Sequence, residues 1–364
     1  MLSLKYYHQK EQRLLTSADN KHKKTKNFVK YLLSIILTAI FLYIAFINVD
    51  FSEVLNIVSK ASIPWILVFI TVMMTSHYVR ALRWKVILNS VKPDTSIKNL
   101  FGAVMVGYGV NCVIPRLGEL SRAVLVGKWE GLSKSSMVGA VIVERVIDII
   151  FLGIAVLVSV LIWTENLYKS FPWLESTLII SMILMACFVV FFYLTIKFRE
   201  KFYGIIVKLL TRISENLAHK VAHVFEMLTH GFASLKGSKN YFYTILLSII
   251  MMLLYGLSAY VGFYTIGMQN IKDVSYNMGW ILMSISAIGV VIPTPGGTGS
   301  YHTLAKSALV LLFGFGEAIS LAYAFLTHII SYFVFIFSAL FVYIFLNKQH
   351  YNFFKIADDE GDAN

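Results

Sequence analysis

The sequence predicts an all-α polytopic membrane protein with two inverted-topology halves, about six full spans and two re-entrant helical hairpins. The chain is 57% hydrophobic and only 14% charged, against roughly 25% charged residues in soluble domains. Several stretches exceed the roughly 18 uncharged residues that a membrane-spanning helix needs. The phrase VIPRLGE at residues 113–119 also recurs as VIPTPGG at residues 291–297, about half a chain length later.

Residues 1–30 predict a basic cytoplasmic segment ahead of the first span. They carry eight lysines or arginines against two acidic residues, and an excess of basic residues marks the cytoplasmic side. The segment is too long for an ordinary signal-peptide n-region, and no small-residue cleavage site follows the first apolar run. We therefore expect the first span to stay attached as an anchor.

Six apolar runs predict full crossings within one transmembrane domain over residues 31–347. The runs are residues 31–49, 63–79, 136–163, 177–196, 241–266 and 318–346. They divide into a first half at residues 31–163 and a second half at residues 177–347. Arg80, Arg83 and Trp84 follow the second run, and we interpret them as a belt of snorkelling side chains at the membrane surface.

Charge placement predicts that the two repeated phrases are the turns of re-entrant hairpins. Residues 80–98 and 116–134 are both basic, so the apolar run between them should enter and leave on the cytoplasmic face. By the same rule, residues 278–316 should dip in from outside and turn within the second phrase. Proline and glycine at both turns break helices. Paired broken segments at matching positions of two halves indicate a transporter's central site.

In an alternative topology, each of the two hairpin segments crosses the membrane once, which gives eight ordinary crossings with the six apolar runs. It would place four basic residues outside with almost no acidic balance, namely Arg116, Arg122, Lys128 and Lys134. The agreement in register also favours hairpins. Pro115 lies 52 residues after Ile63, and Pro293 lies 52 residues after Tyr241.

The connection at residues 197–240 predicts an amphipathic cytoplasmic helix. Apolar residues recur there at three- and four-residue steps, and eight basic residues outnumber three glutamates. Such a helix either lies in the headgroup layer, where its basic face favours anionic lipid, or packs on the helix bundle. Residues 348–364 form an acidic cytoplasmic tail that we expect to be disordered.

The first hairpin turn carries the candidate residues of an anion site. Arg116, Glu119 and Arg122 follow Pro115 at three-residue steps, so they share one face if a helix restarts there. A helix start directs backbone N–H groups and a positive dipole end towards the membrane midplane, which suits an anionic headgroup. Asn111 precedes the turn by four residues and is placed to cap freed backbone groups.

Glu144, Arg145 and Asp148 add charges at the start of the third expected span. Glu144 and Asp148 are four residues apart and share a helix face, while Arg145 can pair with Asp148 or with Glu119. Charged residues at membrane depth are expensive and therefore indicate function. Two interpretations stay open: the charges contact the substrate, or they anchor the helix at the interface.

The second turn is expected to face the first, because its glycines allow the close backbone approach of a phosphate. It contributes five candidate residues, which are Pro293, Pro295, Gly296, Gly297 and Gly299. His302 follows the last glycine by three residues and is a further candidate. We expect His328 to be a hydrogen-bonded packing residue and Lys306 to snorkel outwards.

These motifs resemble the lysylphosphatidylglycerol synthase transmembrane family, also called flippase-like domain proteins. The resemblance covers nearly the whole chain between the first and last spans. The matching motifs are Arg80-x-x-Arg83-Trp84, Asn111-x-x-x-Pro115-Arg116-x-Gly118-Glu119-x-x-Arg122, Glu144-Arg145-x-x-Asp148 and Pro293-x-Pro295-Gly296-Gly297-x-Gly299. The family often has a glutamate three residues after the last glycine, where this chain has His302.

The resemblance implies a lipid-handling membrane protein. The best understood members join this membrane domain to a soluble domain that aminoacylates phosphatidylglycerol. The sequence ends at Asn364, soon after the last expected span, so we expect no aminoacyl-transferase domain and no synthesis of lysylphosphatidylglycerol. Some related proteins have been assigned as membrane glycosyltransferases, which supplies a rival function.

The leading hypothesis is a translocase that moves an anionic phospholipid or a lipid-linked precursor between leaflets. It requires no cofactor, no metal, no catalytic residue and no nucleic acid. The alternatives are a glycosyltransferase or other lipid-modifying transferase that uses a lipid-phosphate substrate, and a non-transporting envelope scaffold. The absence of an Asp-x-Asp motif counts against the transferase. We expect a multi-pass protein of the inner (plasma) membrane with both termini cytoplasmic, and leave open as partners a homo-oligomer or a separate lipid-modifying enzyme.

Overall fold

The computed structural model describes residues 31–163 and 238–350, apart from residues 48 and 90, together with the single residues 183, 190 and 211. The expected N-terminal segment, the expected span at residues 177–196, and almost all of the connection and tail lie outside these residues. The division into domains and the count of six spans therefore stay predictions.

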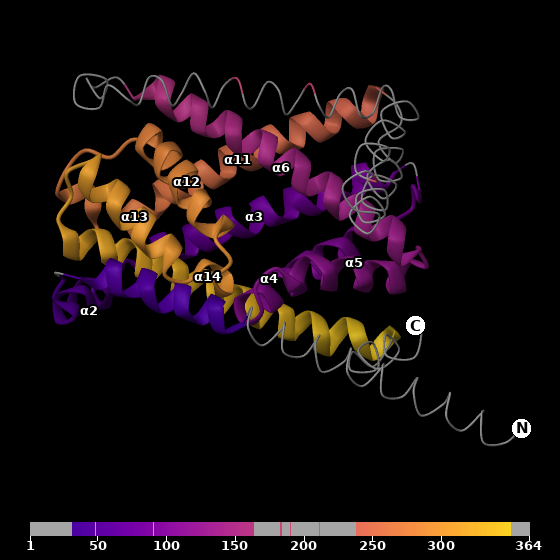
Figure 1. The fold of residues 1–364 in the computed structure, drawn as a ribbon, viewed down its shortest axis with the longest axis horizontal. Coiled ribbons are helices and arrows are strands. Elements are labelled where there is room, and N and C mark those ends of the chain that lie inside the picture. Colours follow the sequence, from indigo (N-terminus) through magenta and orange to yellow (C-terminus); the bar gives the residue numbers. More distant parts are fainter. Residues whose placement is uncertain are drawn as a thin grey trace, which may run out of the picture.

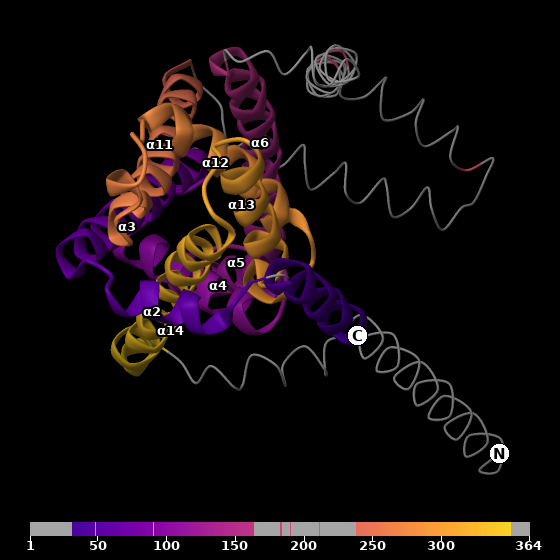
Figure 2. The same ribbon diagram turned by 90° about the vertical axis from the view of Figure 1, so that its left-hand side faces the viewer.

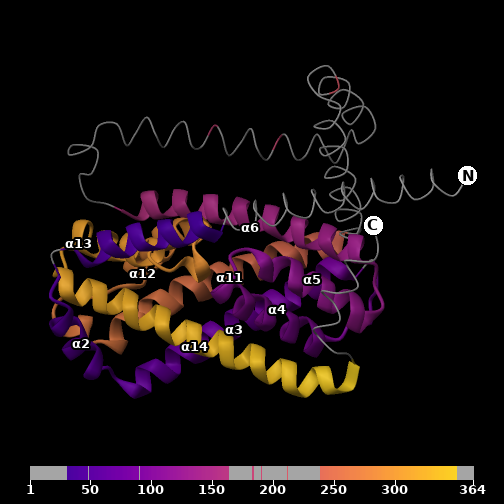
Figure 3. The same cartoon turned by 60° about the horizontal axis from the view of Figure 1, so that its bottom comes forward.

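The described residues are helical and contain no strand, which confirms the all-α membrane fold (Figures 1, 2 and 3). The elements after the first helix, Tyr31–Phe46, are α2 (Phe51–Ser59), α3 (Ile63–Leu88), α4 (Ile97–Val113), α5 (Leu117–Glu130), α6 (Lys134–Ile162), α11 (Ser238–Thr265), η1 (Met268–Asn270), α12 (Tyr276–Val291), η2 (Pro295–Gly297), α13 (Ser300–Leu311) and α14 (Glu317–His350).

Four of these helices, α3, α6, α11 and α14, are long and apolar enough to cross a membrane. The first expected span is shorter than predicted, because Tyr31–Phe46 meets α2 at an angle of 84°. Asp50 starts α2 as its N-cap, and its carboxylate accepts a hydrogen bond of 2.8 Å from the backbone N–H of Ser52. Such a cap stabilises a new helix after the bend.

The two broken segments form helical hairpins. Helix α4 packs against α5, and α12 packs against α13. Close approach of small residues makes this pairing tight: a Cβ on Gly107 would lie 3.0 Å from the carbonyl oxygen of Gly118, and one on Gly289 would lie 2.8 Å from that of Ser300. At 14 and 12 residues, α5 and α13 are too short to span a bilayer. This side-by-side packing contradicts the alternative in which each pair forms one ordinary crossing.

The tips of the two hairpins meet in the middle of the molecule. Figure 1 shows α4 and α5 in one half of the long axis and α12 and α13 in the other. The Arg116 guanidinium donates to the carbonyl of Val291 over 3.0 Å. The Tyr332 hydroxyl on α14 lies 2.6 Å from the carbonyl oxygen of Pro295 and 3.4 Å from that of Cys112. The hairpins therefore close against each other and against α14.

Each hairpin has its own apolar core. One buried cluster joins α4 and α5 to α3 and α6, and another joins α12 and α13 to α11 and α14. Both clusters also include residues of the other expected half, such as Phe69 in the second-hairpin cluster and Val342 in the first-hairpin cluster. Which half opens to the cytoplasm stays a prediction from the distribution of basic residues.

Cysteine labelling can test that orientation. In a variant without Cys112 and Cys187, we expect Lys98→Cys and Ser133→Cys to react with a membrane-impermeant maleimide from the cytoplasmic side alone. These positions lie at the two outer ends of the first hairpin. Asn270→Cys, between α11 and α12, should react from the opposite side alone. Labelling of Lys98→Cys and Ser133→Cys from opposite sides would contradict the re-entrant hairpin.

Candidate functional site

A buried cluster of arginines and carboxylates lies between α3 and α6. Arg80 and Arg83 are three residues apart on α3, and they are 5% and 0% exposed. Arg80 Nη1 lies 2.5 Å from Glu144 Oε1 and 3.0 Å from Asp148 Oδ2. Arg83 Nη2 lies 3.3 Å from Glu144 Oε1 and 2.5 Å from Asp148 Oδ1. The two arginines, three residues apart on α3, thus face the two carboxylates, four residues apart on α6.

These contacts show that the snorkelling belt expected at Arg80, Arg83 and Trp84 is wrong. Helix α3 continues to Leu88, and Trp84 is fully buried like Arg83. A guanidinium needs no water when carboxylates supply its hydrogen bonds inside the protein. The interior of the helix bundle therefore holds both arginines.

The first hairpin contributes a third arginine through α5. Arg122 Nη1 lies 2.8 Å from Glu144 Oε2, and its guanidinium carbon lies 4.8 Å from the centre of the Trp84 ring. The ring face supports the cation in addition to the ion pair. Two of the predicted residues, Arg122 and Glu144, therefore lie together in an ion-pair network that joins α3, α5 and α6.

The cluster opens at Arg145 and Glu119. Arg145 Nη2 lies 3.0 Å from Asp148 Oδ2, and Arg145 Nη1 lies 3.9 Å from Glu119 Oε1. The side chains of Arg145, Glu119 and Asp148 are 38%, 29% and 15% exposed, whereas that of Glu144 is fully buried. A ligand would therefore reach the cluster from the Arg145 end.

Asn111 takes the capping role expected of it. Its side-chain oxygen accepts a hydrogen bond of 2.7 Å from the backbone N–H of Gly118, and its amide nitrogen lies 3.3 Å from Glu119 Oε2. The amide thus satisfies a free donor at the start of α5 and positions a carboxylate of the cluster. Arg116 lies apart from these groups, because it is exposed and bonds to the second hairpin tip.

The cluster has more hydrogen-bond donors than acceptors. In their ionised states, Arg80, Arg83, Arg122 and Arg145 outnumber the carboxylates of Glu119, Glu144 and Asp148 by one charge. Arg83 Nε, Arg122 Nη2 and Arg145 Nε are buried without a hydrogen-bond partner. The acceptor Glu144 Oε2 also has no hydrogen bond, although it lies 2.8 Å from Arg122 Nη1 as an ion pair. Buried polar groups are normally satisfied. The unpaired donors and the excess positive charge together suit an anion such as a phosphate, which guanidinium groups bind in a planar, paired geometry.

The second turn holds its glycines in backbone conformations that other residues rarely adopt. Gly296, Gly297 and Gly299 have φ angles of +54°, +80° and +86°. Ser34 donates to the carbonyl of Pro293 over 2.9 Å, and the Pro295 carbonyl meets Tyr332. The turn is therefore held by the first helix and by α14.

Two histidines secure this turn from the side of α13 and α14. His302 Nδ1 accepts a hydrogen bond of 3.2 Å from the backbone N–H of Gly299. His328 Nε2 lies 3.1 Å from the Gly296 carbonyl oxygen, and the two imidazole centres are 4.6 Å apart. The packing role expected for His328 is confirmed. His302 is placed to stabilise the turn, and the structure does not bring it to the arginine cluster.

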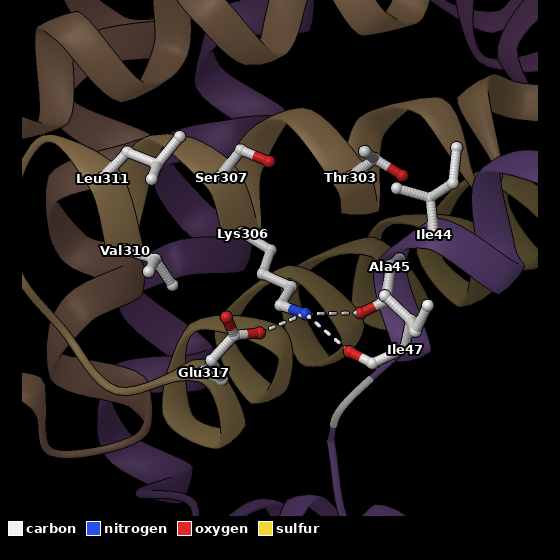
Figure 4. A pocket seen from close by; sticks show the side chains of 9 residues that line it. All are labelled: Ile44, Ala45, Ile47, Thr303, Lys306, Ser307, Val310, Leu311 and Glu317. Atoms are coloured by element: carbon white, nitrogen blue, oxygen red, sulfur yellow. Dashed lines mark hydrogen bonds and ion pairs between the residues drawn. The ribbon is translucent and has the colours of Figure 1, made fainter.

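Lys306 does not snorkel outwards as expected. The residue is 7% exposed, and its ammonium donates to the carbonyls of Ala45 and Ile47 over 3.0 and 3.4 Å and forms an ion pair with Glu317. Figure 4 shows these three acceptors converging on the ammonium. The residues lie beside a cavity of about 190 Å³. The free carbonyls at the end of the first helix attract a cation, which explains the inward position.

Comparison with known proteins assigns a family to this architecture. The sequence profile described as the lysylphosphatidylglycerol synthase TM region matches residues 31–339. The chain belongs to this family. A UPF0104 membrane protein of Methanothermobacter thermautotrophicus is 23% identical over 266 residues, which cover 68% of this chain and 75% of the relative. Another UPF0104 membrane protein, from Methanocaldococcus jannaschii, is 21% identical over 317 residues, or 82% and 90% of the two chains. No solved structure matches the chain.

Within this lysylphosphatidylglycerol synthase TM-family protein, sequence reasoning missed Arg80 and Arg83 as members of the site. Tyr255 and Ser248 on α11 were also missed. The Tyr255 hydroxyl lies 3.1 Å from Arg80 Nη2, and the Ser248 hydroxyl lies 3.0 Å from Arg83 Nη1. The signal for the arginines was the match between their spacing and that of the two carboxylates on α6. No comparable signal marks the hydroxyl partners.

Proposed function

We propose that this family member is a translocase that moves an anionic phospholipid or a lipid-linked precursor between membrane leaflets. The observation that carries the proposal is the arginine–carboxylate cluster, which has excess positive charge, unpaired guanidinium donors and one exposed end. A lipid phosphate entering at Arg145 would bind these donors with charge-assisted hydrogen bonds. Membrane phospholipid is the proposed partner, and the proposed location is the plasma membrane.

The two hairpins supply the second requirement of a translocase, which is a barrier that separates the two sides. Inverted repeats with broken helices near the midplane are the architecture of many alternating-access transporters. The tips here meet through Arg116 and Val291 and through Tyr332. Movement of one hairpin against the other would open the cluster to one side at a time.

The arrangement supports a transferase less well. Such an enzyme needs a carboxylate that can take a proton from the attacking group. Glu144 is paired with Arg80, Arg83, Arg122 and Arg145. Asp148 is likewise paired with several arginines. Neither carboxylate is free for proton transfer, so the pair fits a binding role better than a catalytic one.

Lipid movement in vesicles tests the proposal. Purified protein is reconstituted with phosphatidylglycerol that carries a fluorescent headgroup, and dithionite quenching reports how fast the probe reaches the outer leaflet. We expect Arg145→Gln to slow this movement about ten- to a hundredfold, because one charge-assisted hydrogen bond contributes about 1.5–3 kcal/mol. Arg145 is a suitable position because Glu144 and Asp148 keep their ion pairs with Arg80 and Arg83 when it is neutralised.

Lys98→Gln is the matched control, because it removes one exposed positive charge at the outer end of α4. Its rate should equal that of the wild type, and both variants should keep the wild-type melting temperature. Vesicles in which the wild type moves the probe no faster than protein-free vesicles would refute the translocase. Equal rates for Arg145→Gln and the wild type would remove the cluster from the lipid path.

A further inference from the structure

A long apolar groove lies on the outer side of the first hairpin, where α4 and α5 meet α14. Its volume is about 350 Å³, which is within the range of roughly 300–1,000 Å³ for small-molecule sites. The walls contain no charged residue. They are formed by apolar residues of α4, α5 and α14, among them Val110, Val113, Leu125, Trp129, Ile336 and Tyr343.

The position of the groove on an apolar span indicates that it faces the hydrocarbon interior of the membrane. Its α14 wall belongs to the apolar span Glu317–Phe345. Val113 and Leu340, which border the groove, are 65% and 51% exposed. Trp129 and Tyr343 line its outer end, where amphipathic rings typically mark the membrane interface. The inner end is formed by Val113 and Ile114, directly before the hairpin tip. The groove thus runs from the expected interface to the hairpin tip.

The groove is closed at its base and lined by apolar side chains. Helices α4 and α14 touch there, where a Cβ on Gly109 would lie 2.5 Å from the Cβ of Ala339. A helix with its side chains is about 10 Å wide, whereas an extended acyl chain is a single row of methylene groups. An uncharged groove beside a membrane span therefore suits an acyl chain.

Helix α5 is the common wall of the groove and the arginine cluster. Leu125 and Trp129 line the groove, while Arg122 on the same helix bonds Glu144 in the cluster. We propose that the groove binds one acyl chain of the lipid whose headgroup occupies the cluster. This inference rests on the proposed function, because it assigns the chain-binding part of the same lipid site. The hairpin would then bind the lipid at two places, its phosphate in the arginine cluster and one acyl chain in the groove.

Photo-crosslinking tests this inference. The probe is phosphatidylglycerol with a diazirine at the end of one acyl chain, incorporated into vesicles with the purified full-length protein. We expect the labelled peptides to include residues 106–114 and 336–343. Ile336→Trp fills the groove and should reduce this labelling at least fivefold. Val110→Trp fills it from the opposite wall and provides a second variant if the first does not fold.

Ile329→Trp is a closely matched control. Ile329 and Ile336 lie on α14, are seven residues apart, and are 36% and 37% exposed, but Ile329 does not line the groove. Its substitution should leave labelling unchanged. Labelling spread evenly along the exposed side of α14, or unaffected by either groove-filling variant, would overturn the inference. So would protein–protein crosslinks in place of lipid crosslinks at these peptides.

Leaflet movement of the fluorescent lipid, measured in the same vesicles, separates failure of this inference from failure of the translocase. Groove labelling that Ile336→Trp abolishes, in vesicles where the wild type moves no lipid, would support the groove as a lipid site and refute the translocase. If the wild type moves lipid but neither groove-filling variant reduces the labelling, the translocase would be supported and the groove would be refuted as a lipid site. We expect both readouts to fall together in Ile336→Trp.

Discussion

A Glu144→Gln variant should accumulate in membranes at a small fraction of the wild-type level. Glu144 is fully buried and lies within ion-pair distance of Arg80, Arg83, Arg122 and Arg145. Glutamine keeps the shape of the side chain but removes the charge that these guanidinium groups share. Breaking a buried ion pair by removing one partner destabilises a protein by about 3–5 kcal/mol. Membrane abundance and the melting temperature in detergent measure the loss.

The control for this variant is Glu53→Gln, which neutralises an exposed glutamate in the first turn of α2. It should change neither measurement. Adding Arg122→Gln to Glu144→Gln removes a charge of each sign, so the double variant should be more stable than Glu144→Gln alone. Wild-type abundance and melting temperature in Glu144→Gln would mean that the arginines do not depend on this carboxylate.

Gly299→Ala should also impair the protein strongly, through the second hairpin turn. Gly299 has a φ angle of +86°, and a Cβ there would lie 2.8 Å from the Thr38 carbonyl oxygen and 2.9 Å from the Cβ of Phe41. The backbone strain alone is worth about 1–3 kcal/mol. The added methyl group would also push the first helix away from the turn. We expect a lower melting temperature and slower lipid movement in vesicles.

Gly316→Ala is the control for the turn, because a Cβ at Gly316 meets no atom within 4 Å and no positive φ is recorded there. This variant should match the wild type in stability and in lipid movement. If Gly299→Ala were tolerated equally well, the second turn would not need its observed geometry.

The hairpins could be predicted because their signals are local in the sequence. Pro115 and Pro293 remove backbone donors, and neighbouring glycines weaken a helix. Both turns lie where the structure breaks the helices, at residues 114–116 and 292–299. The meeting of the two tips through Arg116 and Val291 depends on three-dimensional packing. Inverted topology could suggest that contact but could not identify its atoms.

The buried cations were mispredicted for a common physical reason. A general rule places a lone arginine or lysine of a membrane helix at the interface, where water solvates it. Arg80 instead has carboxylate partners 64 and 68 residues away in sequence, and Lys306 meets carbonyls about 260 residues away. These partners satisfy the hydrogen bonds of the cations inside the protein, so the cations do not need water. The only sign of this pairing in the sequence was the matching spacing of charges on separate helices, and that sign was weaker than the general rule.

The contact between the hairpin tips also has an electrical consequence. A membrane potential of 100 mV is worth about 2.3 kcal/mol for each elementary charge that crosses it. The tips are joined through Arg116, Val291 and Tyr332. Under the proposed function they would be the barrier between the two sides, and the voltage would fall mainly across them. The arginine cluster would then share the potential of the side to which Arg145 opens, and the joined tips would oppose a leak of protons through the protein.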